Sequence, residues 1–285
     1  MPDDPERREL APLPAGVELS VLAAGPPPPD VEVVVPEAGT PDLGRLLGSL
    51  PRVRLVQTLS AGVDWALSAI PEGVTVCDAR GVHDIPVAEW TVGAVLAGLK
   101  GLGMDVPERR ELCGRRVLIL GLGSIGAAVA ARLEPFGVEL IAVAHSARPG
   151  VHGVNELPVL LPRAEVLVVL LPLTEETEGI VDAGALALLP DDALVVNAGR
   201  GPLIRTDALL AELEARRLRA VLDVTDPEPL PDDHPLRHAP QTLLTPHIAG
   251  DSPRFKSRAY RLVRAQLERL TAGDPLENVV GRGGY

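Results

Sequence analysis

The stretch that decides the fold is Val117-Leu118-Ile119-Leu120-Gly121-Leu122-Gly123-Ser124-Ile125-Gly126, an apolar run that leads into the spacing G-x-G-x-x-G. The run predicts a buried strand, and the Ala-rich residues after it predict a helix. In such a motif Gly121 permits a tight turn, Gly123 lets a pyrophosphate approach the backbone, and Gly126 lets the helix pack on the strand. The sequence therefore predicts a dinucleotide site over residues 121–126. An incidental glycine-rich turn is the alternative.

Downstream of this loop, β-branched runs alternate with helical stretches, as is typical of βαβ units around a parallel sheet. We expect strands over residues 116–120, 138–144, 165–171, 193–197, 219–224 and 242–245. Their nearly continuous Val, Leu and Ile content suits strands that are covered on both faces. Helices are expected over residues 124–133, 183–189 and 206–217.

The first part of the chain predicts a second α/β domain. Strands are expected over residues 18–23, 32–35, 55–58 and 74–77, and this part has no glycine-rich phosphate loop. Two long helices, over residues 86–99 and 257–270, are expected to connect the domains. We therefore predict one domain of residues 1–87 and 271–285, and a dinucleotide-binding domain of residues 88–270 that includes the connecting helices. A cleft is expected between them.

Composition excludes several classes of function. The 285 residues include 27 basic and 39 acidic side chains, and the net charge of −12 disfavours binding to nucleic acid. No apolar run approaches the roughly 20 residues that cross a bilayer. Two cysteines, Cys77 and Cys113, are too few for a disulfide framework and lack the spacing of a metal site. Because the first residues lack a signal peptide, we expect a cytoplasmic protein without a membrane partner.

The end of the strand after the glycine loop indicates which dinucleotide is preferred. NAD-specific folds place an acidic residue there to bind the ribose 2′-hydroxyl. Here the strand ends in His145-Ser146-Ala147-Arg148, without an acid. Ser146 and Arg148 could bind a 2′-phosphate, which a carboxylate would repel. The sequence therefore predicts a preference for NADP(H), with NAD(H) also possible; the alternative is that Arg148 is a solvated loop charge.

Three further stretches follow expected strands, at the end of a parallel sheet where ligands bind. They are Asn197-Ala198-Gly199-Arg200-Gly201, Leu222-Asp223-Val224-Thr225-Asp226-Pro227-Glu228-Pro229-Leu230 and Leu244-Thr245-Pro246-His247-Ile248-Ala249-Gly250. Arg200 can bind a carboxylate through two hydrogen bonds, and His247 can exchange a proton with a substrate oxygen. Glu228 can hold the imidazole and favour its protonated form. Taken singly, these residues could be a surface charge, a loop acid and a structural turn residue.

Across nearly its whole length the chain resembles the D-isomer-specific 2-hydroxyacid dehydrogenase family, including its glyoxylate/hydroxypyruvate reductases. The resemblance also rests on Leu59-Ser60-Ala61-Gly62-Val63-Asp64, Pro86-Val87-Ala88-Glu89-Trp90-Thr91 and Leu171-Pro172-Leu173-Thr174. It implies two Rossmann-like domains, a flavodoxin-like substrate domain and a doubly wound dinucleotide-binding domain, with the active site in the cleft. It also implies a homodimer.

The resemblance implies a role for each site residue. Arg200 and the backbone amides of Ala61 and Gly62 would bind the substrate carboxylate. His247 would donate the proton to the substrate oxygen, and Glu228 would orient His247. The implied contacts to the cofactor are Gly121, Leu122, Gly123, Ser124, Ile125, Gly126, His145, Ser146, Arg148, Pro172, Thr174, Ala198, Asp223, His247 and Gly250.

The chain departs from the family pattern at three places. Residues 100–114 are short and lack an aromatic, in a segment that commonly contributes to dimer contacts, so the dimer geometry is open. Thr225 and Arg237 stand where aromatics are common, which indicates a more open or more polar substrate pocket. Trp65 is placed either near the cleft or in a core.

The expected function is hydride transfer between NADP(H) and a small 2-oxo or D-2-hydroxy acid. One alternative is a nucleotide-sensing, non-catalytic interaction protein of the same fold. Another is a dehydrogenase of a different small anion, such as phosphite.

Overall fold

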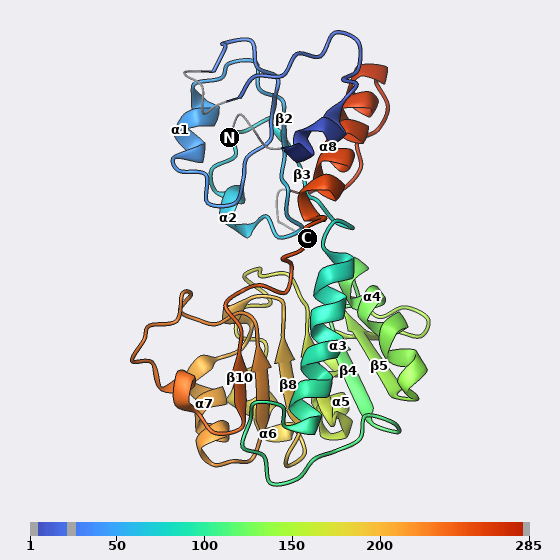
Figure 1. Cartoon of the computed structure of the whole chain (residues 1–285), viewed down its shortest axis with the longest axis vertical. Helices are drawn as coiled ribbons and strands as arrows, with labels where there is room; N and C mark the ends of the chain where they lie inside the picture. Colours follow the sequence, from blue (N-terminus) through green and yellow to red (C-terminus); the bar gives the residue numbers. More distant parts are fainter. Residues whose placement is uncertain (1–4, 22–26, 282–285) are drawn as a thin grey trace. The chain divides into compact units, whose positions relative to one another are not determined.

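The computed structural model describes residues 5–21 and 27–281. The chain forms two compact units, one of Met1–His83 with Ser252–Tyr285 and one of Asp84–Asp251 (Figure 1).

The second unit, Asp84–Asp251, is built on a seven-stranded sheet in which every paired strand is parallel.

The strand order in this sheet is β10-β9-β8-β7-β4-β5-β6, so the chain starts in the middle and winds outward in both directions. β4, which leads into the glycine loop of residues 121–126, pairs with both β5 and β7. The strands are β4 (Arg116–Leu120), β5 (Glu139–Ala144), β6 (His152–Gly153), β7 (Val166–Val169), β8 (Leu194–Asn197), β9 (Arg219–Leu222) and β10 (Thr242–Leu244).

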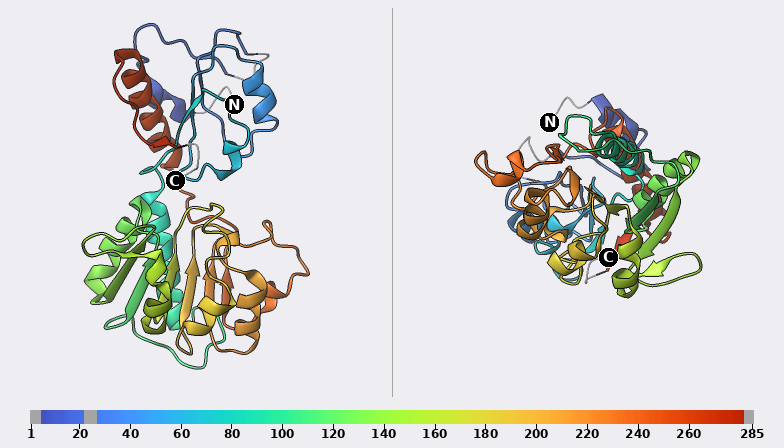
Figure 2. Two further views of the ribbon diagram at one scale, coloured as in Figure 1. Left: turned by 180° about the vertical axis from the view of Figure 1, so that it is seen from behind. Right: turned by 90° about the horizontal axis from the view of Figure 1, so that it is seen from below.

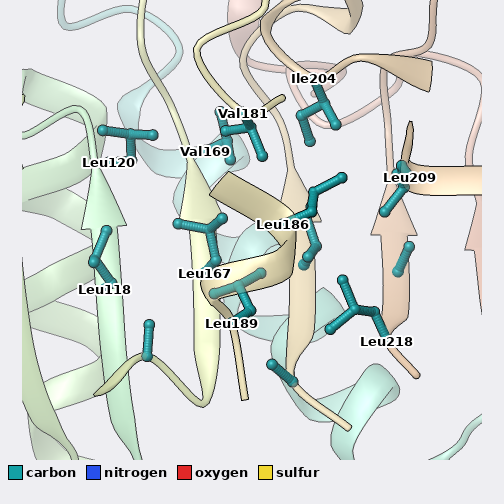
Figure 3. Packing of buried hydrophobic residues seen from close by; sticks show 14 of the residues in the cluster. Leu118, Leu120, Leu167, Val169, Val181, Leu186, Leu189, Ile204, Leu209 and Leu218 are labelled. Carbon is teal, nitrogen blue, oxygen red and sulfur yellow. The ribbon is translucent and has the colours of Figure 1, made fainter. Parts of the chain in front are cut away.

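Helices cover both faces of this sheet, as the two ribbon views show (Figure 2). Alternate residues of β4 face opposite sides: Leu118 and Leu120 belong to one buried cluster, and Val117 and Ile119 to the other. Figure 3 shows the first cluster, in which these leucines share a layer with Leu186. That face is covered by α5 (Leu157–Leu160), α6 (Ala183–Leu188) and α7 (Thr206–Glu214), and the other by α3 (Asp84–Lys100) and α4 (Ser124–Leu133).

The first unit contains a four-stranded sheet with the order β1-β2-β3-β11. The first three strands are parallel, and β11 runs antiparallel to β3. Its elements are a 3-10 helix (Pro5–Leu10), β1 (Val33–Val34), α1 (Leu43–Gly48), β2 (Leu55–Gln57), α2 (Asp64–Leu67), β3 (Thr75–Cys77), α8 (Phe255–Ala272) and β11 (Val279–Val280). The prediction of an α/β fold with two Rossmann-like domains is confirmed.

Two local expectations differ from the structure. Residues 18–21 form no strand, and residues 22–23 of that expected strand lie outside the described residues. The units divide at 83/84 and 251/252, whereas the sequence prediction placed the boundaries at 87/88 and 270/271. The boundary lies at 251/252, and not at 270/271, because α8 buries Ala259, Tyr260 and Val263 in a cluster with residues of the first unit.

The short segment between α3 and β4 is tied to its own sheet. Arg219, fully buried at the start of β9, donates hydrogen bonds to both carboxylate oxygens of Asp192 at 2.6 and 2.7 Å. The same guanidinium donates to the backbone carbonyl of Glu108 at 2.9 Å, and Arg110 pairs with Asp192 at 2.5 Å. Because a buried guanidinium needs such partners, residues 108–110 are held at the amino end of β9.

The helices among the described residues include no candidate membrane span. α3 and α8 are the longest of the described helices, with 17 and 18 residues. Within the described residues, none of the helices combines the length and the apolar character that crossing a bilayer requires.

Candidate active site

The glycine loop joins β4 to α4 in the second unit, and each of its glycines has a steric explanation. Gly121 has a φ of +113°, and a Cβ on it would lie 2.6 Å from the Leu170 carbonyl carbon. A Cβ on Gly126 would lie 2.1 Å from the Gly121 carbonyl oxygen, so only glycine lets α4 approach the turn. By contrast, nothing lies within 4 Å of a Cβ placed on Gly123. The protein itself leaves that space open, which fits the approach of a pyrophosphate to the backbone.

The loop after β5 brings a cation to the glycine loop. Arg148 donates a hydrogen bond through Nη2 to the Leu122 carbonyl at 3.1 Å. Its backbone amide and carbonyl both pair with those of Val151, which fixes a tight turn. His145, Ser146 and Arg148 are all exposed, so their side chains are accessible to a ligand.

This loop has an acidic neighbour that the sequence pattern does not reveal. Glu176, in the loop after β7, lies 3.7 Å from Nδ1 of His145, and both side chains are about three-quarters exposed. Such an exposed pair contributes little to stability. It nevertheless places a carboxylate beside the loop that is predicted to bind the 2′-phosphate.

The loop after β7 is shaped by Thr177, a residue outside the motifs that the sequence singles out. Its hydroxyl donates to the Pro172 carbonyl at 2.7 Å and accepts a hydrogen bond from the Thr174 backbone amide at 2.8 Å. Thr177 is 9% exposed, so these bonds are shielded from water. The two predicted cofactor contacts, Pro172 and Thr174, are thus fixed by one buried threonine. Its only sequence signal is the Thr-x-x-Thr spacing, which suits a local hydroxyl-backbone bond.

The loop after β8 carries Arg200 and is held by hydrogen bonds with the side chain of Asn197. The buried Asn197 amide donates to the Arg200 carbonyl at 2.9 Å and accepts from the Gly199 amide at 3.0 Å, so it spans the loop that includes Ala198. A Cβ on Gly201 would lie 1.9 Å from the Thr225 carbonyl oxygen. Only glycine at this position lets the Arg200 loop lie against the chain that leads to Glu228.

Glu228 and His247 are in direct contact. Nδ1 of His247 forms a hydrogen bond with Oε1 of Glu228, and the two side chains are 49% and 38% exposed. With Nδ1 engaged in this bond, the imidazole presents Nε2 on its other side. His247 has a φ of 54°, in the left-handed region that non-glycine residues seldom occupy. Such a conformation persists only where the surroundings hold it.

The buried carboxylate of Asp223 holds the loop that carries His247. It accepts hydrogen bonds from the Thr245 hydroxyl at 2.5 Å, the Ile248 amide at 2.9 Å and the Ala249 amide at 2.7 Å. The Asp223 carbonyl also accepts from the His247 amide at 2.8 Å. Asp223 is therefore a structural anchor for this loop, and its predicted contact with the cofactor stays a prediction, as does that of Gly250.

These loops all leave the same edge of the sheet. β8, β9 and β10 are neighbouring parallel strands, and Asn197 is in register with Leu222, which in turn is in register with Leu244. The loops with Arg200, Glu228 and His247 follow the carboxyl ends of these strands, and the glycine loop follows that of β4. The structure thus brings the predicted proton donor, its partner carboxylate and the arginine to the edge that also carries the dinucleotide motif.

Ala61 and Gly62 lie in a loop after β2 in the first unit. Ser60 Oγ donates to the Gly62 carbonyl at 2.8 Å, and the Trp65 indole donates to the same carbonyl at 3.1 Å. Within the part of the chain that the structure describes, no hydrogen bond from the backbone amide of Ala61 or Gly62 is formed. Trp65 therefore braces this loop while packing against the core of its own unit.

Buried amides support the same loop. The Gln57 side chain donates to the backbone carbonyls of Thr58 and Asp78 at 2.9 and 3.0 Å, and its own carbonyl accepts from Gln266 at 3.1 Å.

Burial raises the pKa of the neighbouring Cys77 thiol to about 11, so this thiol stays protonated near neutral pH.

The two residues that replace common aromatics bond to their own loops. Thr225 Oγ1 donates to the Pro227 carbonyl at 2.9 Å. Arg237 donates to the carbonyls of Leu230 and Pro231 at 2.5 and 2.8 Å. Both side chains therefore contribute to the shape of the loop that carries Glu228.

Comparisons with known proteins agree on a family. The family model described as the NAD binding domain of D-isomer specific 2-hydroxyacid dehydrogenase matches residues 99–249. The chain is 33% identical over 262 residues to a glyoxylate/hydroxypyruvate reductase A from Salmonella newport, an alignment that covers 82% of each protein.

Solved structures are similar over most of the chain. A D-isomer specific 2-hydroxyacid dehydrogenase from Xanthobacter autotrophicus, solved with NADPH and MES, has a TM-score of 0.85 at 30% identity and covers 98% of this chain and 93% of its own. An NADPH-dependent glyoxylate/hydroxypyruvate reductase from Sinorhizobium meliloti, solved with NADP and sulfate, has a TM-score of 0.79 at 29% identity and covers 90% and 86%. The chain therefore belongs to the D-isomer specific 2-hydroxyacid dehydrogenase family, whose enzymes use a nicotinamide dinucleotide.

Proposed function

We propose that the protein reduces small 2-oxo acids to D-2-hydroxy acids with NADPH, glyoxylate and hydroxypyruvate being the first candidates. The observation that carries the proposal is the contact between His247 and Glu228 at the sheet edge that also bears Arg200 and the glycine loop. Relatives named as glyoxylate/hydroxypyruvate reductases support the substrate class.

Each residue has a task in this reaction. Arg200 and the amides of Ala61 and Gly62 bind the substrate carboxylate, because a guanidinium and free backbone amides are donors that suit an anion. A bound nicotinamide supplies the hydride to the carbonyl carbon. Nε2 of the protonated His247 donates its proton to the substrate oxygen, so that the C=O bond becomes a CH–OH group. Glu228 keeps the imidazole oriented through Nδ1 and balances its charge.

An assay of substrates separates this proposal from its rivals. Purified protein is mixed with NADPH or NADH and a panel of 2-oxo acids, and with NADP⁺ or NAD⁺ and phosphite, while nicotinamide absorbance is followed. We expect oxidation of NADPH with glyoxylate or hydroxypyruvate. Turnover of phosphite alone would indicate a dehydrogenase of that anion. No absorbance change with any compound would favour a nucleotide-sensing interaction protein.

The preference for NADPH is assigned to Arg148, supported by Ser146. Replacing Arg148 with alanine is expected to raise the NADPH dissociation constant about tenfold to a hundredfold, the usual loss for hydrogen bonds to a charged group. The NADH constant should change little. Both are measured by quenching of protein fluorescence.

Arg163 provides the matched control. It is an exposed arginine that pairs with Glu139 at 2.7 Å, at the amino end of β5 and therefore at the opposite edge of the sheet. Arg163→Ala should leave both constants unchanged. Equal affinity of the unmodified protein for the two cofactors would contradict the assigned preference.

From the resemblance we also propose a homodimer that acts in the cytoplasm. Light scattering of the purified protein measures the first of these, and a dimer has twice the mass of one chain. The cytoplasmic location stays a prediction.

A further inference from the structure

The carboxylate of Asp84, a residue of α3, lies at the start of α4, the helix that follows the glycine loop. Asp84 is the first residue of α3, and its Oδ1 accepts a hydrogen bond from Ser124 Oγ at 3.0 Å. Ser124 is the first residue of α4, directly after Gly123. The first turn of α4 has no acidic residue of its own. A negative charge is thus brought from a neighbouring helix to the end of α4 where the pyrophosphate is expected.

This arrangement sets two anions in competition. The N-terminus of a helix attracts negative charge, so the Asp84 carboxylate is favourable there when no cofactor is bound. A pyrophosphate approaching the same helix end would meet a like charge, which opposes binding.

The direction of the hydrogen bond adds to this effect. A serine hydroxyl has one proton to donate, and Ser124 donates it to Asp84. Towards a phosphate oxygen, the hydroxyl of Ser124 then presents only lone pairs. It can donate to the phosphate only after it releases Asp84.

We propose that Asp84 is a positioning residue that competes with the cofactor for the Ser124 hydroxyl and thereby weakens dinucleotide binding. The consequence for turnover is faster release of the oxidised cofactor. The inference rests on the proposed function for the cofactor class, but NADPH and NADH share the pyrophosphate, so it holds for both whichever is preferred.

The test is the variant Asp84→Asn, which keeps the size of the side chain and removes its charge. The asparagine amide can donate to Ser124 Oγ, which frees the hydroxyl proton for a phosphate. The dissociation constants of NADPH and NADH, measured by fluorescence titration of the full chain, should each fall about threefold to tenfold. The gain should shrink at high salt, because salt screens the repulsion. Unchanged or weaker binding would overturn the proposal.

Two further variants complete the design. Asp207 is an acidic residue in the first turn of α7, a different helix of the same unit. Asp207→Asn should leave the dissociation constants of NADPH and NADH unchanged. In a Ser124→Ala background, the gain from Asp84→Asn should be smaller, because the hydrogen bond is already absent. An equal gain there would overturn the role of Ser124. Since misfolding weakens binding, a gain in affinity separates this role from a merely structural one, and titration without substrate separates it from failure of the proposed reaction.

Discussion

The His247→Ala protein is expected to reduce 2-oxo acids about a hundredfold to ten-thousandfold more slowly than the unmodified protein. The imidazole is the group that can supply a proton to the substrate oxygen, and Glu228 holds its Nδ1. NADPH binding should be largely intact, because the glycine loop and Arg148 are untouched. Steady-state kinetics gives kcat, and fluorescence titration gives the NADPH dissociation constant.

Glu228→Gln tests the partner of the histidine. It should lower kcat less than His247→Ala does, because the imidazole remains while its charged partner is lost. Full activity of His247→Ala would falsify the assigned role.

The second large effect is expected at Arg200. Arg200→Gln should lower kcat/KM for 2-oxo acids about thirtyfold to several thousandfold, because removing one partner of a charged, hydrogen-bonded pair costs about 2–5 kcal/mol. Most of the loss should appear in KM if the guanidinium binds substrate and transition state equally, and in kcat if it acts mainly on the transition state. NADPH binding should stay close to that of the unmodified protein.

Arg205 offers a matched control for this change. It follows the same loop five residues later, is exposed, and lies 3.7 Å from Glu178. Arg205→Gln should keep kcat/KM within about twofold, since an exposed pair of this kind contributes at most about 1 kcal/mol. If both variants lost activity to the same extent, the assignment of Arg200 to the substrate carboxylate would be wrong.

Much of the second unit could be predicted from the sequence because its signals are local. The apolar run before Gly121 and the later Val- and Leu-rich runs correspond to β4 and to β7–β9, which are buried on both faces. The position of α8 could not be predicted in the same way. Its buried Ala259 and Val263 are compatible with packing on either unit, and only the tertiary contacts decide that they pack on the first.

The same distinction applies to the candidate site. The sequence could predict that one edge of the sheet carries Arg200, Glu228 and His247, because the carboxyl ends of parallel strands share an edge. The anchoring role of Asp223 could not be predicted, because it depends on hydrogen bonds to backbone amides 25 and 26 residues further along the chain. The hydrogen bond between Asp84 and Ser124, 40 residues apart, was hidden for the same reason.

The anchoring of the His247 loop through its backbone has a consequence for redesign. Because Asp223 binds the amides of Ile248 and Ala249, the course of this loop is set without help from the side chain at position 247. Other polar side chains that tolerate the left-handed backbone conformation at that position could therefore be installed with the scaffold intact. The loop therefore offers protein engineers a position for new chemistry beside the proposed nicotinamide site.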